Sequence, residues 1–162
     1  MLFRSAIEGF LFGTAPNEFL AREAGRLAPG SRVLCVADGE GRNSTYLAGL
    51  GHDVHAVEAA ANALEKARAL AAAMMAEAQT IAKKILSCVY RVQESFGAGH
   101  VAAVLRGSNT AAIRERKHDK VSTYGLLADH SLAEIRDFIQ QLIGQELLVQ
   151  AGHEYPVLKL NS

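Results

Sequence analysis

The sequence has 162 residues, of which 49% are hydrophobic and 21% charged, as in ordinary globular proteins of one or two small domains. Its formal net charge is zero, so any attraction for nucleic acid, a membrane surface or an acidic substrate must come from a local cluster. No apolar run reaches the roughly 20 residues that span a bilayer, and the N-terminus lacks the pattern of a secretory signal. Cys35 and Cys88 lie far apart, without metal-ligand spacing. We therefore expect a cytoplasmic protein without membrane contact, disulfide or metal site.

The first predicted elements form a strand–helix–strand unit. A helix begins near Pro16 and is stopped by Pro29 and Gly30. Residues 32–37 form a short apolar run, typical of strands buried on both faces, and residues 53–57 form a second one. Residues 43–50 between them are predicted to be helical. This order predicts a parallel, right-handed crossover, which is the opening of a Rossmann-like βαβ fold.

The segment 59–96 contains no Gly or Pro and is rich in strong helix formers. One helix of that length would measure about 55 Å at 1.5 Å per residue, which exceeds the usual length in globular proteins. We therefore expect a seam between two parts of the chain in residues 71–79, where Ala and Met give no sharp apolar stripe.

The pattern becomes sharper beyond this seam. Apolar residues recur at helical spacing from Ile81 to Phe96, and Gly97 is placed to cap the end of that helix. A second short helix carries Val101, Val104 and Leu105. Ser131 is a good N-cap for a third helix, and residues 147–150 and 155–160 alternate as strands around a turn at 151–154. Three helices followed by a hairpin is the order of a winged helix.

A glycine turn follows the first predicted strand. Asp38-Gly39-Glu40-Gly41 lies between that strand and a helix, and Glu58 ends the next strand. Glycines let the backbone approach a nucleotide-like ligand, the helix start offers free N–H groups, and an acid at the second strand end can accept ribose hydroxyls.

Residues 10–20, 33–43 and 54–58 together resemble the small class I S-adenosylmethionine-dependent methyltransferases, especially the tellurite-resistance-like group. In that family the glycine turn holds the methionine part of the cofactor and the acid holds its ribose. The resemblance therefore implies that the cofactor-binding residues are Asp38, Gly39, Gly41 and Glu58.

The five further strands of the methyltransferase family are absent from this chain. Two parallel strands have unpaired edges and cannot enclose a cofactor. The first interpretation is thus a remnant of a βαβ unit held by tight turns, and retained binding of S-adenosylmethionine is the alternative. Methyl transfer would need a partner chain to complete the sheet. The unpaired edges also favour self-association by edge pairing between copies.

Separated motifs in the second half of the chain resemble another family. They are Ile-Leu-Ser-Cys-Val-Tyr-Arg at 85–91, the segment 96–108, Ser-Thr-Tyr-Gly at 122–125 and the segment 154–160. Over residues 79–161 they resemble the RQC domain of bacterial RecQ DNA helicases, which implies a winged helix that binds duplex DNA beside the unwinding fork. The chain lacks the family's upstream zinc-binding cysteines and any Gly-x-x-x-x-Gly-Lys-Ser/Thr phosphate loop. We therefore expect no ATP-driven helicase activity from this chain alone.

A local excess of positive charge lies between Arg106 and Lys120, where five Lys and Arg residues outweigh Glu115 and Asp119. A simple solvated loop is the alternative interpretation, but phosphate contact is the usual role of such a cluster in a DNA-binding family. The residues expected to meet DNA are Arg106, Ser108, Asn109, Thr110, Arg114, Arg116, Lys117 and Lys120, with His153 at the hairpin tip.

The sequence thus predicts a truncated Rossmann-like α/β fragment over residues 1–72, a helical seam over 73–78 and an α+β winged-helix domain over 79–162. The expected function is binding of duplex or forked DNA, without catalysis in isolation and without a required cofactor. One alternative is a protein that binds S-adenosylmethionine and carries a C-terminal interaction module. Another is a fusion of two family fragments, natural or engineered, with no evolved joint function.

Overall fold

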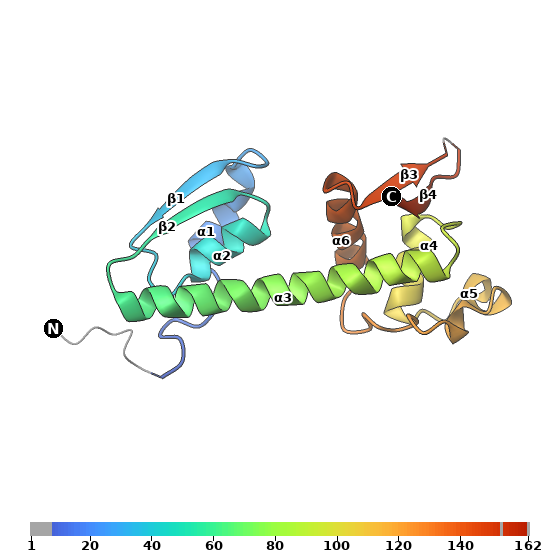
Figure 1. Cartoon of the computed structure of the whole chain (residues 1–162), viewed down its shortest axis with the longest axis horizontal. Helices are drawn as coiled ribbons and strands as arrows, with labels where there is room; N and C mark the ends of the chain where they lie inside the picture. Colours follow the sequence, from blue (N-terminus) through green and yellow to red (C-terminus); the bar gives the residue numbers. More distant parts are fainter. Residues whose placement is uncertain (1–7, 153, 162) are drawn as a thin grey trace. The chain divides into compact units, whose positions relative to one another are not determined.

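The computed structural model describes residues 8–152 and 154–161, and the chain divides into two compact units, residues 1–76 and 77–162. One long helix, α3 (Ala61–Arg91), contributes residues to both units (Figure 1). Each unit otherwise has its own helices and its own two-stranded sheet.

The sheet of the N-terminal unit consists of two parallel strands, β1 (Arg32–Val36) and β2 (Asp53–Val57), paired from Arg32↔Asp53 to Val36↔Val57. Helix α2 (Arg42–Gly49) connects them. The predicted parallel pair is therefore present. Its assignment as part of a Rossmann-like fold stays a prediction.

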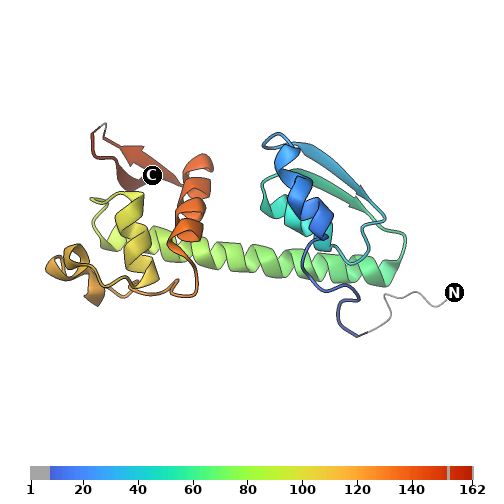
Figure 2. The same cartoon turned by 180° about the vertical axis from the view of Figure 1, so that it is seen from behind.

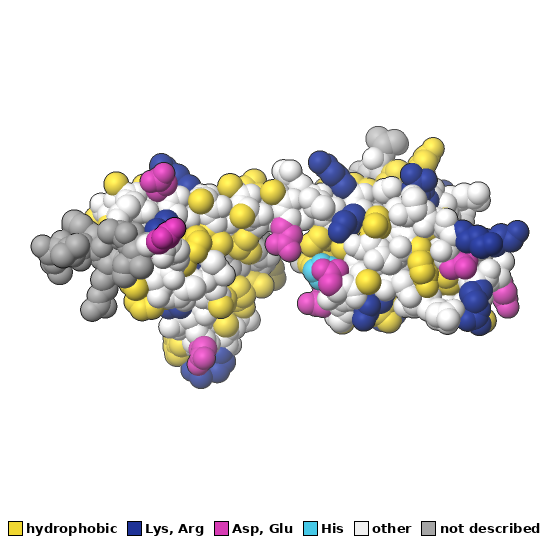
Figure 3. Space-filling view, turned by 90° about the horizontal axis from the view of Figure 1, so that it is seen from below, with side chains coloured by type: hydrophobic (Ala, Val, Ile, Leu, Met, Phe, Trp, Pro, Cys, Tyr) yellow, Lys and Arg dark blue, Asp and Glu magenta, His cyan; other side chains and the backbone are white. Residues whose placement is uncertain are grey.

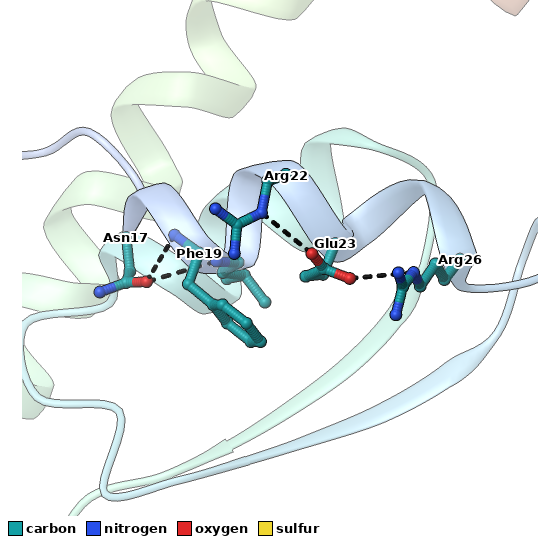
Figure 4. A network of polar contacts seen from close by, with 6 residues as sticks. Asn17, Phe19, Arg22, Glu23 and Arg26 are labelled. Atoms are coloured by element: carbon teal, nitrogen blue, oxygen red, sulfur yellow. Dashed lines mark hydrogen bonds and ion pairs between the residues drawn. The ribbon is translucent and has the colours of Figure 1, made fainter.

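A short capped helix precedes this sheet. Helix α1 (Glu18–Glu23) continues as the 3-10 turn η2 (Ala24–Arg26). Asn17 begins the helix, because its side-chain oxygen accepts the backbone N–H groups of Phe19 and Leu20. Glu23 contacts both Arg22 and Arg26 through its two carboxylate oxygens (Figure 4). These local contacts fix the helix start and the bend after it.

The helices of this unit lie on one side of the sheet (Figures 1 and 2), and the described residues of the unit place no helix on the other face. The side chains of Leu34 and Val36 on β1 are 64% and 72% exposed, and Val57 beside them on β2 is 55% exposed. The prediction of strands buried on both faces is therefore wrong. The apolar pattern is typical of strands with helices on both faces of the sheet, but residues 8–76 provide helices for one face only.

Helix α3 runs without interruption through the segment where we expected a seam. Residues 72–80 are all exposed, so this stretch has almost no tertiary packing to hold it. Its Ala, Met, Glu and Gln residues have high helix propensity, and propensity is sufficient to continue a helix that packing has started on both sides. The helix therefore does not break here, whereas the division between the two units, after Ala76, falls within this stretch.

The C-terminal unit has the predicted order of three main helices and a hairpin. The end of α3 is followed by α4 (Ala98–Arg106), the short α5 (Ala111–Glu115), the 3-10 turn η3 (His118–Lys120) and α6 (Leu132–Gly144). The antiparallel strands β3 (Leu148–Ala151) and β4 (Val157–Leu160) close the unit. Its core includes Ile85, Val89, Val104, Ile139 and Leu158, all with no exposed surface.

Of two helix-end residues predicted from the sequence, Ser131 has the predicted position and Gly97 does not. Ser131 begins α6 with a capping box, because its hydroxyl accepts the N–H of Glu134 and the Glu134 carboxylate accepts the N–H of Ser131. Gly97, however, does not cap α3, which ends at Arg91. Gly97 begins α4 instead, and a Cβ there would lie 2.8 Å from the carbonyl oxygen of Pro156, so it allows the β4 side of the hairpin to approach.

In the part of the chain that the structure describes, no helix combines the length and apolar character needed to cross a bilayer.

Candidate nucleic-acid interface

The predicted DNA-contacting residues, His153 apart, lie in one continuous stretch of the C-terminal unit, residues 106–120, which we call the basic segment. It starts at the last residue of α4, includes α5 and ends with η3. Figure 3 shows Lys and Arg side chains gathered at the end of this unit where α5 lies in Figure 1, with fewer acidic ones among them. The fold therefore concentrates the positive charge at one end of the winged helix.

Several polar groups of the basic segment make hydrogen bonds within the C-terminal unit. Thr110 begins α5 by accepting the N–H of Ile113, and Arg114 donates to Asn109 Oδ1 at 2.5 Å. Arg106 donates to the carbonyl oxygen of Ala128. Ser108 is half-buried and its N–H donates to Ala103, which closes the end of α4. These contacts shape the loop, so a role in phosphate binding would be added to a structural one.

The cations of the basic segment have no acidic partners within the described residues. Among the described residues, none of the ion pairs includes Arg106, Arg114, Arg116, Lys117 or Lys120. The side chains of all five are exposed. Exposed cations without a carboxylate partner can bind the phosphates of a polyanion, whereas the charge of paired cations is already neutralised by the carboxylate.

Two histidines connect the basic segment to the start of α4. His100 Nε2 and His118 Nδ1 are 2.8 Å apart, and Phe96 stacks on His100 with ring centroids 4.4 Å apart. The Arg116 guanidinium lies over the Phe96 ring, 5.3 Å from its centroid. Burial lowers the pKa of both histidines, with further lowering by Arg116 and, for His100, by His118. A neutral histidine pair thus anchors the loop.

The hairpin supplies no described side chain for the predicted contact at its tip, because His153 lies outside the described residues. Gly152, just before it, has φ +97, and Tyr155 after it is among the most exposed aromatic residues of the unit.

The glycine turn of the N-terminal unit brings the predicted cofactor-binding residues together, but they bond to one another. The backbone N–H of Gly39 donates to Glu58 Oε2 at 2.8 Å, and the N–H of Ala60 donates to Oε1 at 2.9 Å. These bonds, the Ala60 bond first, lower the pKa of Glu58. Asp38 in turn accepts from the N–H and hydroxyl of Ser44. The acid expected to hold a ribose therefore already binds the amide expected to approach the ligand.

Gly41 packs closely against α3, and its expected contact with a ligand stays a prediction. It has φ +87, and a Cβ would lie 2.6 Å from Ala67 Cβ and 2.8 Å from Ala67 Cα on α3. The space in front of this glycine is thus filled by the chain's own helix. Gly39 differs, since a Cβ there would meet nothing within 4 Å. The residues present do not form a ready cradle for S-adenosylmethionine.

Glu40, for which the sequence pattern predicts no role, lies buried in the same turn. Its carboxylate accepts from Lys66 Nζ at 2.7 Å and from the N–H of Leu11 at 2.6 Å. Burial alone would raise the pKa of Glu40, but the bonds from Lys66 and Leu11 outweigh burial and lower it. Lys66 also donates to the Gly9 carbonyl oxygen. The turn is therefore tied to the N-terminal segment and to α3.

Three helices around one core and a C-terminal antiparallel hairpin define the residues 77–162 as a winged-helix domain. Comparison with known families agrees, since the model of the RQC domain matches residues 72–162, more than half of the sequence. The chain belongs to the RQC domain family.

Curated proteins similar to this chain include two that are named ATP-dependent DNA helicase RecQ. The protein of Bacillus subtilis is 38% identical over 81 residues, which are 50% of this chain and 14% of the relative. That of Haemophilus influenzae is 42% identical over 80 residues, 49% of this chain and 13% of the relative. The chain therefore matches only about a seventh of the length of these relatives. Neither they nor the family match supports the resemblance of the N-terminal part to methyltransferases, which stays a prediction.

Proposed function

We propose that the C-terminal unit binds duplex or forked DNA through its phosphates, without reading the base sequence. The observation that carries this proposal is the set of exposed cations in the basic segment without a carboxylate partner among the described residues. Membership of the RQC family and similarity to proteins named as DNA helicases support DNA as the polyanion. The proposal includes no ATP-driven unwinding by this chain alone, because its sequence contains no phosphate loop for ATP.

Salt dependence tests this proposal. Titration of a labelled hairpin duplex at several salt concentrations is expected to give a log–log slope of roughly −4, as four or five neutralised phosphates require. The triple variant Arg116→Gln, Lys117→Gln, Lys120→Gln should weaken binding and flatten the slope by about 3. Lys83→Gln, an exposed substitution on α3, is the matched control. A duplex that fails to bind at low salt would remove the proposal.

Binding of S-adenosylmethionine by the N-terminal unit is the alternative proposal. Its support is the strand–turn–helix order with Asp38, Gly39 and Glu58 side by side. Calorimetry separates the two proposals, because DNA binding alone predicts no saturable heat with this cofactor. The alternative predicts saturable heat that is lost in Glu58→Ala. The bonds that Glu58 already makes to Gly39 and Ala60 weigh against the alternative.

The N-terminal sheet also supports the proposal of self-association. Both strands have an unpaired edge, and the apolar side chains of Leu34, Val36 and Val57 are exposed on one face. Sedimentation over a range of protein concentrations should show reversible dimers, and Val36→Lys should shift them to monomers. A monomer at all concentrations would contradict this proposal without affecting DNA binding.

A further inference from the structure

An open cavity of about 670 Å³ lies in the C-terminal unit between the last turn of α3 and the end of η3. Tyr90 and Arg91 line it from the helix, Gln93 and Glu94 from the turn that follows, and Lys120 and Ser122 from the far side. Only Lys120 belongs to the basic segment. The cavity therefore extends the positive surface to residues for which neither the sequence analysis nor the proposed function has a use.

Tyr90 offers this cavity an aromatic face. Its side chain is 69% exposed, although its neighbour Val89 is fully buried. The helical spacing that directs Val89 and Val92 into the core directs Tyr90 to solvent. Within the described residues its hydroxyl has no hydrogen-bond partner. Exposed single aromatics are common, but one that lines a cavity beside cations has the elements of a base-stacking platform.

The charges around the cavity favour an anion. Arg91 and Lys120 are exposed, and no described carboxylate pairs with either. Glu94 is the acidic residue among those that line the cavity, and its carboxylate is engaged, because Oε2 accepts the N–H of Leu160 at 3.0 Å. Two cations against one engaged acid leave a net attraction for a phosphate.

The backbone that forms the wall is held in an unfavourable conformation. Gln93 and Glu94 have φ +62 and +51, a left-handed conformation that side chains other than glycine rarely adopt. Their N–H groups donate to the carbonyl oxygens of Tyr90 and Val89, which is the hydrogen-bond pattern of a Schellman helix end. This turn usually contains glycine. Backbone strain is often found at binding sites, so its presence at the wall of this cavity supports a binding role for the cavity.

We infer that this cavity binds an unpaired nucleotide of a nucleic-acid strand, with the base stacked on Tyr90 and a phosphate held by Arg91 and Lys120. The inference rests on the proposed function, since the strand reaches the cavity as an extension of the duplex held by the basic segment. It adds a preference to that function: a duplex with a single-stranded overhang should bind more tightly than a blunt one.

The test compares a blunt hairpin duplex with the same duplex carrying a short overhang that contains a fluorescent adenine analogue. The full chain should bind the overhang substrate more tightly and quench the analogue. Tyr90→Ala should reduce affinity for the overhang substrate by about 5- to 150-fold, as expected for one stacked base, and leave the blunt duplex unchanged. Tyr90→Phe should retain both the affinity and the quenching. Arg91→Gln should weaken overhang binding and leave the quenching at saturation.

Each other result has one meaning. If neither substrate binds, the proposed function fails together with this inference. If the blunt duplex binds and the overhang adds nothing, or if Tyr90→Ala weakens both substrates equally, the inference alone is overturned. Equal losses in Tyr90→Phe and Tyr90→Ala would exclude stacking. Saturable binding of deoxyadenosine monophosphate alone, lost in Tyr90→Ala and without any gain from the overhang, would assign the cavity to free nucleotides and overturn the strand assignment. Circular dichroism checks that each variant is folded.

Discussion

Gly39 and Gly41 both have a left-handed backbone conformation, but only Gly41 is packed against another residue. Substituting each by alanine therefore separates the cost of backbone strain from the cost of a steric overlap. Both have positive φ, which costs a non-glycine residue about 1–2 kcal/mol. A Cβ at Gly41 would also overlap Ala67, including its backbone, and overpacking adds about 1–3 kcal/mol. We expect Gly41→Ala to lower the free energy of unfolding of the N-terminal unit by about 2–5 kcal/mol.

Gly39→Ala is the matched control, and its cost should be about 1–2 kcal/mol. Thermal unfolding followed by circular dichroism measures both. Equal losses in the two variants would mean that α3 does not pack on the turn, and the space at Gly41 would then be open to a ligand.

The paired histidines make stability depend on pH. Their folded pKa values are lowered, first by burial, so the unfolded chain binds more protons than the folded chain as pH falls through the ordinary histidine value of about 6.5. Stability of the C-terminal unit is thus complete above that value and declines below it. The double variant His100→Gln, His118→Gln should show a shallower decline in melting temperature between about pH 7 and pH 5. An unchanged slope would contradict a neutral pair.

At the scale of elements, the end of α3 contains a residue, Gln93, whose left-handed backbone conformation is unfavourable for a side chain other than glycine. Gln93 takes the position where a Schellman motif usually has glycine. Gln93→Gly should raise the free energy of unfolding by about 1 kcal/mol, because it removes the left-handed strain and retains the N–H bond to Tyr90. Urea denaturation measures this change. Gln93→Ala, which keeps a Cβ, should bring no gain.

Elements with local signals were predictable from the sequence, and those set by distant contacts were not. Ser131 carries its own capping box, and the apolar spacing from Ile85 to Val92 placed the first core helix correctly. The end of α3 was missed because Gln93 and Glu94 have no propensity for the left-handed turn. Besides the local bonds to Tyr90 and Val89, the Glu94 carboxylate accepts a bond from the N–H of Leu160, 66 residues away.

The candidate site was predictable to the same extent. The basic segment is continuous in sequence, so composition located it. Its anchoring to α4 by the His100–His118 contact joins residues 18 apart and gave no signal in the spacing. Tyr90 could have been found, since the periodicity that buries Val89 excludes it from the core.

At the scale of the whole molecule, the two units differ in how much core they possess. The buried apolar cluster of the C-terminal unit lies entirely between Ile85 and Leu158. The buried apolar residues of the N-terminal unit, among those described, are Ala24, Leu47 and Ala63. Because burial of large apolar side chains is the main stabilising contribution, we expect independent folding only from the C-terminal unit.

Expression of residues 77–162 alone tests this expectation. The fragment should unfold cooperatively in urea and bind the hairpin duplex with the affinity of the full chain. Residues 1–76 alone should lack a cooperative transition. A C-terminal fragment that does not fold would show that its stability depends on the preceding residues.

The exposed stretch of α3 at residues 72–80 has a consequence for the handling of the protein. An exposed helical stretch opens locally far more often than one packed on a core, and each opening presents an extended backbone to a protease. Limited digestion should therefore cut the chain in this stretch before the core of the C-terminal unit yields. The larger product would then be the winged helix, which under the proposed function should still bind the hairpin duplex.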